Sequence, residues 1–280
     1  MVLGTAQFGM DYGIANLMGK PTRKDVLSIL ALAWEKGVRR FDTAPGYGSE
    51  KVLGEFIKAN GLENETKLLT KIPSMESKDY RDFIRLKLDA SVNYLRCPIN
   101  VLFFHNPEDS VLLIKDPEFF KGIKEDYSIS EFGVSIYDPQ EIEFLSDSPY
   151  ELAFQFPFNV LDRRFKQVNM HEGMRYARSI FLQGILASRC KLDKKAPKPL
   201  LELQMNYHSF LNKREINPLK YALSFAYFAD NVDYFLIGVD TSQQLNEILN
   251  IEIDTLKHFE DFDSFSFEYD SKWLDPRKWN

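Results

Sequence analysis

Short apolar runs alternate with longer stretches of helical period along almost the whole chain of 280 residues. The predicted strands cover residues 1–4, 38–42, 67–71, 101–105, 132–135, 152–156, 176–181 and 234–237. Strict alternation of this kind implies parallel strands that are joined by right-handed crossovers. Eight strand–helix units in about 250 residues predict a closed (β/α)8 barrel, the TIM-barrel architecture, as a single α/β domain.

The stretches between the strands have the period of amphipathic helices. The predicted helices cover residues 23–36, 49–58, 79–95, 118–126, 139–145, 200–213, 218–229 and 242–249, with a short helix starting near Arg163. Ser49 is the expected N-cap of its helix, because serine is a preferred capping residue. A doubly wound open sheet is the competing architecture, but no G-x-G-x-x-G motif follows the first strand. We expect residues 1–250 to form the barrel and residues 251–280 to form a C-terminal tail that packs on it.

The amino-acid composition argues against several classes of protein. The chain is 44% hydrophobic and has a net charge of −6 with scattered basic residues, so no nucleic-acid partner is predicted. Cys97 and Cys190 match no metal-binding or redox spacing, and no metal is predicted. Few cysteines, no targeting segment and no apolar run of membrane-spanning length predict a soluble, cytoplasmic protein without a membrane partner. The sequence leaves the oligomeric state open.

Four polar residues lie at or just past the ends of predicted strands. Asp42, Lys71 and His105 end the second, third and fourth strands, and Tyr47 follows Asp42 by five positions. Active sites of (β/α)8 enzymes lie at the carboxyl ends of the strands. Because neighbouring strands lie about 5 Å apart, these side chains can converge. Each residue alone fits a loop cap, a turn residue or a solvated strand end. Their placement on consecutive strands favours a catalytic site.

The chemistry of this set is proton transfer. A tyrosine hydroxyl has an ordinary pKa of about 10, too high for an efficient acid at neutral pH. We expect the Lys71 ammonium to lower the pKa of the Tyr47 hydroxyl, and Asp42 to hold Lys71 charged. His105 would hydrogen-bond a substrate carbonyl oxygen. No side chain can deliver hydride, so carbonyl reduction by this set would need a cofactor.

Several motifs of the chain resemble those of the aldo-keto reductase family, over nearly its whole length. LGTAQFG (residues 3–9) resembles the first-strand motif of that family, and FDTA (41–44), YGSE (47–50) and LG (53–54) resemble its most specific signature. Lys71 and His105 fall where the family keeps its catalytic lysine and histidine. The resemblance implies reduction of an aldehyde or ketone to an alcohol, with Tyr47 as general acid, Lys71 and Asp42 as its tuning pair, and His105 orienting the carbonyl.

The same resemblance implies that NADPH or NADH binds in extended form across the strand ends. The implied cofactor-binding residues are Gly4, Thr5, Ala6, Asp42, Ser135, Gln155, Arg178, Ser179, Phe181, Gln183, Gly184, Gly238, Gln244 and Glu247. Three positions depart from the family pattern. Ile136 stands where asparagine is frequent, and Arg178 stands where an aromatic residue commonly stacks on the nicotinamide. Asp240 adds a negative charge where basic residues would pair with a 2′-phosphate, so the choice between NADPH and NADH stays open.

Two other classes of function compete with a reductase. A barrel that binds the cofactor as a sensor or auxiliary subunit, with little turnover, fits the altered positions Ile136 and Arg178. Lyase or isomerase chemistry would need a metal or phosphate site, and no Asp, Glu and His cluster has ligand spacing.

The expected partner is a small-molecule carbonyl substrate. The segments expected to shape its pocket are 10–21, 106–114 and 187–200, and the side chains expected to line it are Tyr12, Phe158, Asn159, Trp273 and Trp279. Asn159, Asp162 and Arg163 are polar enough to suggest a hydroxylated substrate such as a sugar-type carbonyl.

Overall fold

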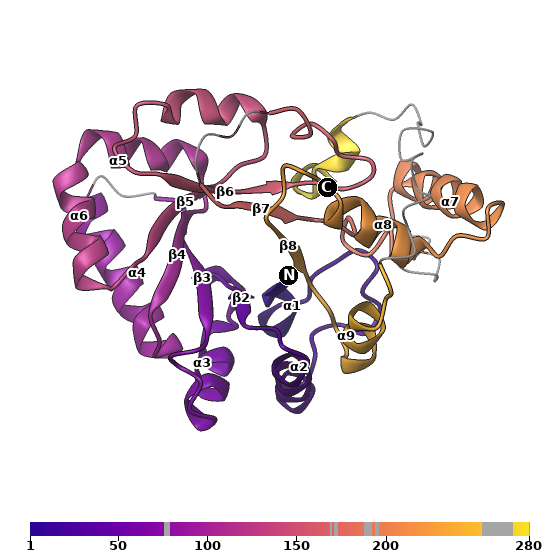
Figure 1. The fold of residues 1–280 in the computed structure, drawn as a ribbon, viewed down its shortest axis with the longest axis horizontal. Coiled ribbons are helices and arrows are strands. Elements are labelled where there is room, and N and C mark those ends of the chain that lie inside the picture. Colours follow the sequence, from indigo (N-terminus) through magenta and orange to yellow (C-terminus); the bar gives the residue numbers. More distant parts are fainter. Residues whose placement is uncertain are drawn as a thin grey trace.

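In the computed structural model, eight parallel strands close into a barrel in sequence order, and the helices lie outside it (Figure 1). The structure describes residues 1–75, 79–168, 170, 173–187, 192–193, 196–253 and 271–279. The strands are β1 Val2–Gly4, β2 Arg40–Asp42, β3 Lys67–Ile72, β4 Ile99–Phe104, β5 Glu131–Ser135, β6 Leu152–Pro157, β7 Arg175–Arg178 and β8 Tyr234–Ile237. Each strand overlaps its predicted range, and the predicted (β/α)8 barrel is confirmed.

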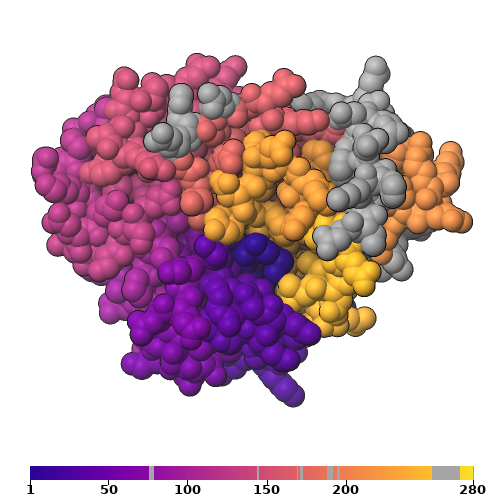
Figure 2. Space-filling view, in the orientation of Figure 1, coloured from indigo at the N-terminus to yellow at the C-terminus, as the bar shows by residue number. Residues whose placement is uncertain are grey.

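The helices follow the strands in the order that the sequence pattern predicts. They are α1 Ala6–Gly9, α2 Arg23–Glu35, α3 Glu50–Ala59, α4 Tyr80–Leu95, α5 Leu112–Lys115, α6 Pro117–Asp126, α7 Lys198–Asn212, α8 Pro218–Tyr227 and α9 Ser242–Leu249. Short 3-10 helices cover Pro45–Tyr47, Pro107–Val111, Pro139–Leu145, Ser271–Leu274 and Pro276–Lys278. Helix α7, in orange, projects at the right edge of the molecule (Figure 2). In the described parts of the chain, no helix has the length and apolar character that crossing a membrane requires.

Helix α2 shows how the local sequence sets an element. The Thr22 hydroxyl accepts from the Asp25 backbone N–H at 3.3 Å, and the Asp25 carboxylate accepts from the Thr22 N–H at 3.2 Å. This capping box satisfies two backbone donors that a helix start leaves free. Gly37, with φ +85°, ends the segment in a conformation that glycine adopts without strain. The buried face consists of Val26, Ile29, Leu30 and Ala33.

Two predicted helical segments differ in the structure. Residues 139–145 form a 3-10 helix that starts at Pro139 behind an Asp138 capping box. The predicted helix near Arg163 is wrong, because residues 164–167 form only a turn in the described part of the chain. The Arg164 guanidinium binds the buried Asp162 carboxylate, two residues earlier, at 2.7 and 2.8 Å, and this local pair stabilises the turn.

The barrel interior forms a floor beneath the carboxyl ends of the strands. Its side chains are Val2, Leu69, Val101, Phe103, Ala153, Tyr176 and Leu236. In β3, Leu69 and Lys71 face the interior because successive side chains of a strand point to opposite faces. A Cβ at Gly133 would lie 2.6 Å from the Phe103 ring, so a glycine in β5 makes room for that ring. The polar residues at the carboxyl ends of the strands therefore lie on a layer of closely packed side chains.

Part of the C-terminal segment lies against the barrel. Leu274 is buried in the main core, and Trp273 and Trp279 pack against that core. The Trp279 indole N–H donates to the Trp273 carbonyl at 3.1 Å. Cys97 is a buried free thiol, whereas Cys190, residues 254–270 and Asn280 lie outside the described residues. The domain boundary at residue 250 stays a prediction.

Candidate active site

A buried ion pair joins the ends of β2 and β3. The Lys71 ammonium donates to Asp42 Oδ1 at 2.7 Å, to Asp42 Oδ2 at 2.8 Å and to the Thr43 carbonyl at 3.0 Å. Gln155 Nε2 also donates to Asp42 Oδ1, at 2.8 Å. Asp42 and Lys71 are 3% and 2% exposed. Burial lowers the pKa of Lys71, and the Asp42 carboxylate opposes that shift. Hydrogen bonds between the two residues, and to Gln155 and the Thr43 carbonyl, thus fix the pair in place.

Tyr47 stands beside this pair at the end of the 3-10 helix that follows β2. A Cβ at Gly9 would lie 1.8 Å from the Tyr47 carbonyl oxygen, so glycine lets α1 press against the Tyr47 backbone. The Lys71 ammonium lies 5.1 Å from the centroid of the Tyr47 ring. The rings of Tyr47 and His105 meet edge to face, with centroids 6.4 Å apart. The structure therefore brings all four predicted catalytic residues together.

The acidity of Tyr47 differs from the sequence prediction. Burial raises the pKa of the Tyr47 hydroxyl, the Asp42 carboxylate raises it further, and Arg178 opposes both. The expected lowering by Lys71 was wrong, because the Lys71 ammonium is hydrogen-bonded to Asp42 and to the Thr43 carbonyl. The phenol is protonated at neutral pH and can act as a proton donor.

His105 is uncharged at neutral pH. Burial lowers the pKa of the His105 imidazole to about 4, and the neighbouring cations Lys71 and Arg178 lower it in the same direction. A neutral imidazole carries one ring N–H and can donate one hydrogen bond. His105 is held at the end of β4 by its backbone N–H, which donates to the Ile72 carbonyl at 3.0 Å.

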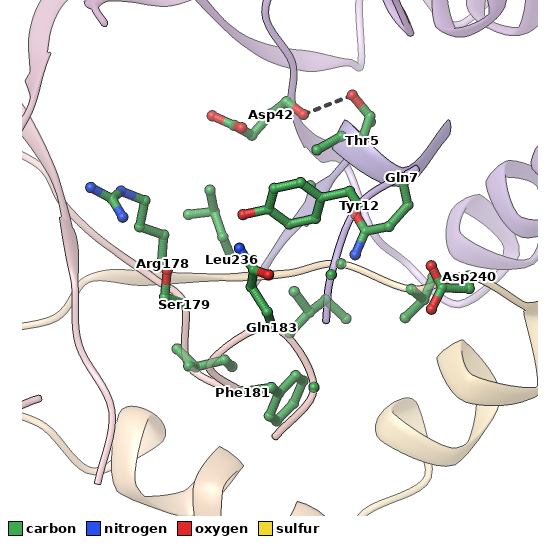
Figure 3. A pocket seen from close by; sticks show the side chains of 18 of the residues that line it. Thr5, Gln7, Tyr12, Asp42, Arg178, Ser179, Phe181, Gln183, Leu236 and Asp240 are labelled. Atoms are coloured by element: carbon green, nitrogen blue, oxygen red, sulfur yellow. Dashed lines mark hydrogen bonds between the residues drawn. The ribbon is translucent and has the colours of Figure 1, made fainter. Parts of the chain in front are cut away.

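Three hydroxyl residues connect the ends of β1 and β2. The Ser49 hydroxyl hydrogen-bonds the Thr5 hydroxyl at 2.8 Å and the Thr43 hydroxyl at 3.0 Å. Ser49 is the N-cap residue of α3, as predicted, but its side chain makes these two bonds in place of a bond to the backbone of the helix. Thr5 in turn donates to the Asp42 carbonyl at 2.9 Å, the bond drawn in Figure 3.

Glu50, the first residue of α3, lies buried behind Lys71. Its carboxyl group accepts from the Thr70 hydroxyl at 2.8 Å and from the Ser91 hydroxyl at 3.2 Å. Burial raises the pKa of the Glu50 carboxyl group. These contacts tie α3 to β3 and α4 next to the residue that carries the ammonium.

The four residues lie at the inner end of a cavity of about 460 Å³ that opens at the carboxyl ends of the strands. Asn16, Asp240, Gln244 and Glu247 line its outer end. Arg178 and Asp240 lie on opposite sides of the pocket in Figure 3. Every residue of the predicted cofactor-binding set lines this cavity: Gly4, Thr5, Ala6, Asp42, Ser135, Gln155, Arg178, Ser179, Phe181, Gln183, Gly184, Gly238, Gln244 and Glu247.

The loop after β7 forms one wall of the cavity. The sequence predicts a strand to residue 181, but β7 ends at Arg178 because Ser179 has a positive φ of 59°. Leu182 and Gln183 also have positive φ, which turns the chain sharply over the cavity. The Gln183 carbonyl and side-chain oxygens accept from the Ala15 and Ile14 N–H groups at 3.3 and 3.2 Å. Residues 13–16 thereby bridge to the β7 loop.

Asn16 connects residues 13–16 to Asp240 at the outer end of the cavity. Its side-chain amide donates to Asp240 Oδ1 at 3.2 Å, and the Asp240 N–H donates to Gln244 Oε1 at 2.7 Å. Asn16 falls in the segment 10–21 that was expected to shape the pocket, but sequence reasoning singled out none of Asn16, Gln7 and Tyr137, all of which line the cavity. Asn16 and Tyr137 stand on loops and no motif marks them, whereas Gln7 lies inside the LGTAQFG motif.

Of the residues expected to line a substrate pocket, Tyr12 does so. Phe158 does not: it is 1% exposed and stacks on Phe225 in the core, with centroids 5.0 Å apart. Asn159 is fully buried and binds the Ser179 carbonyl at 3.0 Å. Trp273 and Trp279 also stand apart from the lining residues.

The residues that suggested a sugar-type substrate therefore have structural roles. The Asn159 side-chain oxygen accepts from the Leu161 and Asp162 N–H groups, both at 2.9 Å. Asp162 is itself fully buried and paired with Arg164. The Ile136 side chain is likewise buried in the core.

A model of the aldo/keto reductase family matches residues 1–263. The chain belongs to the aldo/keto reductase family. The resemblance carried by the LGTAQFG, FDTA and YGSE motifs is thereby confirmed.

Curated relatives match a shorter part of this aldo/keto reductase. An aldo-keto reductase from Mycobacterium sp. (strain KMS) is 30% identical over 128 residues, which cover 45% of this chain and 46% of that protein. Norsolorinic acid reductase stcV from Emericella nidulans is 32% identical over 121 residues, which cover 38% of this chain and 31% of that protein. The matched stretch thus spans less than half the length of each of these relatives.

Solved structures resemble the chain over nearly its whole length. The glycerol dehydrogenase AKR11B4 from Gluconobacter oxydans has a TM-score of 0.69 at 19% identity, covering 93% of this chain and 90% of that one. The aldo-keto reductase AKR11C1 from Bacillus halodurans, in its holo form, has a TM-score of 0.69 at 18% identity. The match covers 94% of this chain and 91% of that one. At these identities the likeness shows a shared fold.

Proposed function

We propose that this aldo/keto reductase uses NADH or NADPH to reduce an aldehyde or ketone to an alcohol. The observation that carries the proposal is the convergence of a protonated phenol, a neutral imidazole and a buried Lys71–Asp42 pair at the inner end of one cavity. The names of the relatives, which include a reductase and a dehydrogenase, support the same class of chemistry.

Each inner-end residue has a role in this proposal. His105 donates its ring N–H to the carbonyl oxygen of the substrate and fixes the orientation of the carbonyl group. Tyr47 gives its hydroxyl proton to the same oxygen as the alcohol forms. The Lys71–Asp42 pair, held by its own hydrogen bonds, places the Lys71 ammonium 5.1 Å from the centroid of the Tyr47 ring and so helps to position the phenol. When bound, a reduced nicotinamide supplies the hydride.

Free polar groups of the cavity fit such a cofactor. The side chains of Ser135 and Gln155 line the cavity, and the Gln155 amide nitrogen is engaged by Asp42. The Ser135 hydroxyl and the Gln155 carbonyl oxygen have no hydrogen-bond partner within the described residues. A hydroxyl and a carbonyl oxygen side by side on paired strands suit the carboxamide of a nicotinamide, which both donates and accepts hydrogen bonds.

The outer end favours NADH over NADPH in this proposal. Within the described lining of the cavity, the cations are Lys71 and Arg178, and both serve the inner end. Asp240 and Glu247 make the outer end acidic. A carboxylate suits a ribose hydroxyl as a hydrogen-bond acceptor, whereas it repels a 2′-phosphate, which arginine or lysine would bind.

Cofactor titration followed by a substrate screen tests the proposal. Binding of NADH and NADPH is measured by the change in nicotinamide fluorescence, and the tighter cofactor is then offered with aldehydes, ketones and aldoses. Cofactor oxidation at 340 nm with several carbonyls is the expected result. Tight cofactor binding without turnover on the whole panel would contradict a reductase and favour a sensor or auxiliary subunit.

A further inference from the structure

Tyr137 stands between two arginines at the inner end of the cavity. The guanidinium carbon of Arg178 lies 3.8 Å from the centroid of the Tyr137 ring, and that of Arg277 lies 3.3 Å from it. One ring face has room for one planar guanidinium at such a distance, so the two cations lie on opposite faces. We call Arg178, Tyr137 and Arg277 the arginine–tyrosine stack.

The stack joins two distant parts of the chain. Arg178 ends β7, and Arg277 belongs to the 3-10 helix Pro276–Lys278 near the C-terminus. Arg178 and Tyr137 line the cavity itself. Arg277 is exposed, and its charge contributes to the lowered pKa of His105, after burial and the nearer cations. The stack therefore lies on the side of the cavity where the carbonyl of a substrate would be reduced.

The positive charge of Arg178 has no counter-ion in the described residues. Its Nη2 donates to the Ile136 carbonyl at 3.0 Å, and no carboxylate of the described chain lies within ion-pair distance. Lys71, by contrast, is paired with Asp42. A half-buried guanidinium without a carboxylate partner is unfavourable unless another anion joins it.

Hydrogen-bond donors of the stack remain available. Arg277 uses Nε and Nη2 to hold the buried Asp275 carboxylate, at 2.7 to 3.2 Å, which leaves its Nη1 free. Arg178 has Nε and Nη1 free, since its one hydrogen bond uses Nη2. Such donors match the oxygens of a carboxylate or phosphate.

We propose that the arginine–tyrosine stack binds an anionic group of the substrate, so that the preferred carbonyl compounds carry a carboxylate or a phosphate. This inference rests on the proposed carbonyl reduction and names its substrate class. The pyrophosphate of the cofactor is the other source of such an anion. Arg178 lies across the pocket from Asp240 (Figure 3). Its charge acts on Tyr47 and His105, which places it near the reacting groups and favours the substrate.

A matched pair of aldehydes tests the substrate class. 4-Carboxybenzaldehyde carries a carboxylate, and methyl 4-formylbenzoate presents the same aldehyde with a neutral ester. We expect kcat/KM for the acid to exceed that for the ester by at least about tenfold, since charge-assisted hydrogen bonds are among the stronger ones. Equal values for the two aldehydes would overturn the inference and leave carbonyl reduction intact. Failure to reduce either aldehyde would count against both.

The Arg277→Gln variant assigns the effect to the stack. It should lower kcat/KM for the acid about tenfold and change that for the ester less than about twofold. Lys278→Gln is the matched control, because it removes one charge from the neighbouring residue, whose ammonium lies 3.8 Å from Asp275. If the two variants lowered kcat/KM equally, or if Arg277→Gln lowered it equally for the acid and the ester, the role of Arg277 would be merely structural and the proposal would fail.

Binding measurements separate the two sources of the anion. Calorimetric titration of the oxidised complex with 4-(hydroxymethyl)benzoate should show saturable binding that Arg277→Gln weakens and Lys278→Gln preserves. Arg178→Gln should weaken the same binding, and Arg277→Gln should leave the dissociation constant of NADH within about threefold of wild type. If Arg178→Gln instead weakens NADH binding about tenfold and leaves the preference for the acid unchanged, the stack binds the cofactor and the proposal fails.

Discussion

The two ends of the cavity are built differently. At the inner end, Asp42 and Lys71 are almost inaccessible to solvent and bound to each other, to Gln155 and to the Thr43 carbonyl. At the outer end, Asp240 is half-buried, and Gln244 and Glu247 are exposed on α9. A reaction needs groups that stay fixed while charge develops, whereas binding of a long ligand tolerates exposed contacts. This contrast agrees with the proposed function, in which the inner end transfers the proton and the outer end binds the cofactor tail.

The largest expected effect is at the inner end. Tyr47→Phe removes the proposed proton donor and should lower kcat by about 100-fold to 10,000-fold, the usual contribution of general acid catalysis. NADH binding, followed by fluorescence, should stay close to that of wild type because the outer end is untouched. Retention of full turnover would show that the proton comes from another group.

The buried ion pair should also carry much of the local stability. Lys71→Met leaves the Asp42 carboxylate buried without its counter-ion and should lower the free energy of unfolding by about 3–5 kcal/mol, measured by urea denaturation. Arg23→Met is the control, since it breaks the exposed Arg23–Glu55 pair at 2.9 Å and should cost less than about 1 kcal/mol. Similar costs for the two variants would contradict the contrast between buried and exposed pairs.

At the outer end, charge should select the cofactor. We expect NADH to bind at least about tenfold tighter than NADPH, and Asp240→Asn to narrow the ratio of their dissociation constants several-fold by removing a negative charge. Asp230→Asn makes the same change at an exposed residue outside the lining of the cavity and should leave the ratio unchanged. Tighter binding of NADPH than of NADH by the wild type would contradict the proposal that Asp240 disfavours the 2′-phosphate.

The smallest expected effect concerns pH. Because the pKa of His105 is lowered from 6.5 to about 4, its imidazole stays neutral in the folded protein while the unfolded chain takes up a proton below 6.5. His105 therefore lowers stability as pH falls through that window. Between about pH 6 and pH 8, kcat/KM for a neutral aldehyde should change less than about twofold. An inflection near the ordinary histidine pKa that disappears in His105→Gln would contradict a neutral His105.

The residues at strand ends were predictable because the barrel fixes their positions. Once Asp42, Lys71 and His105 are assigned to consecutive parallel strands, the closed sheet brings them to one rim, whatever the loops do. Tyr47 follows from its short distance to Asp42 along the chain. The acidity of Tyr47 was not predictable in this way, since it depends on how deeply the ring is buried and on which partner the Lys71 ammonium binds.

The loops and the C-terminal segment were not predictable from pattern. Tyr137 and Arg277 stand outside the strands, so no period or motif places them near the cavity, and only the folded chain brings Arg277 onto the Tyr137 ring. The prediction that Asn159 lines the pocket was wrong for a different reason. A polar residue after a strand can face a cavity or serve as a buried hydrogen-bonding group, and Asn159 does the latter. Sequence reasoning thus located the candidate catalytic residues, and the structure supplied the arginines that we propose bind the substrate.

Transfer of label from the cofactor to the product tests the central claim most directly. The protein is mixed with an aldehyde and with NADH that carries deuterium at C4 in one or the other configuration, and the alcohol is analysed by mass spectrometry. A cofactor held in one orientation beside Tyr47 and His105 exposes one of the two C4 positions to the carbonyl. The account predicts one deuterium on the carbinol carbon from one of the labelled cofactors and none from the other. An alcohol without deuterium in both experiments would contradict it.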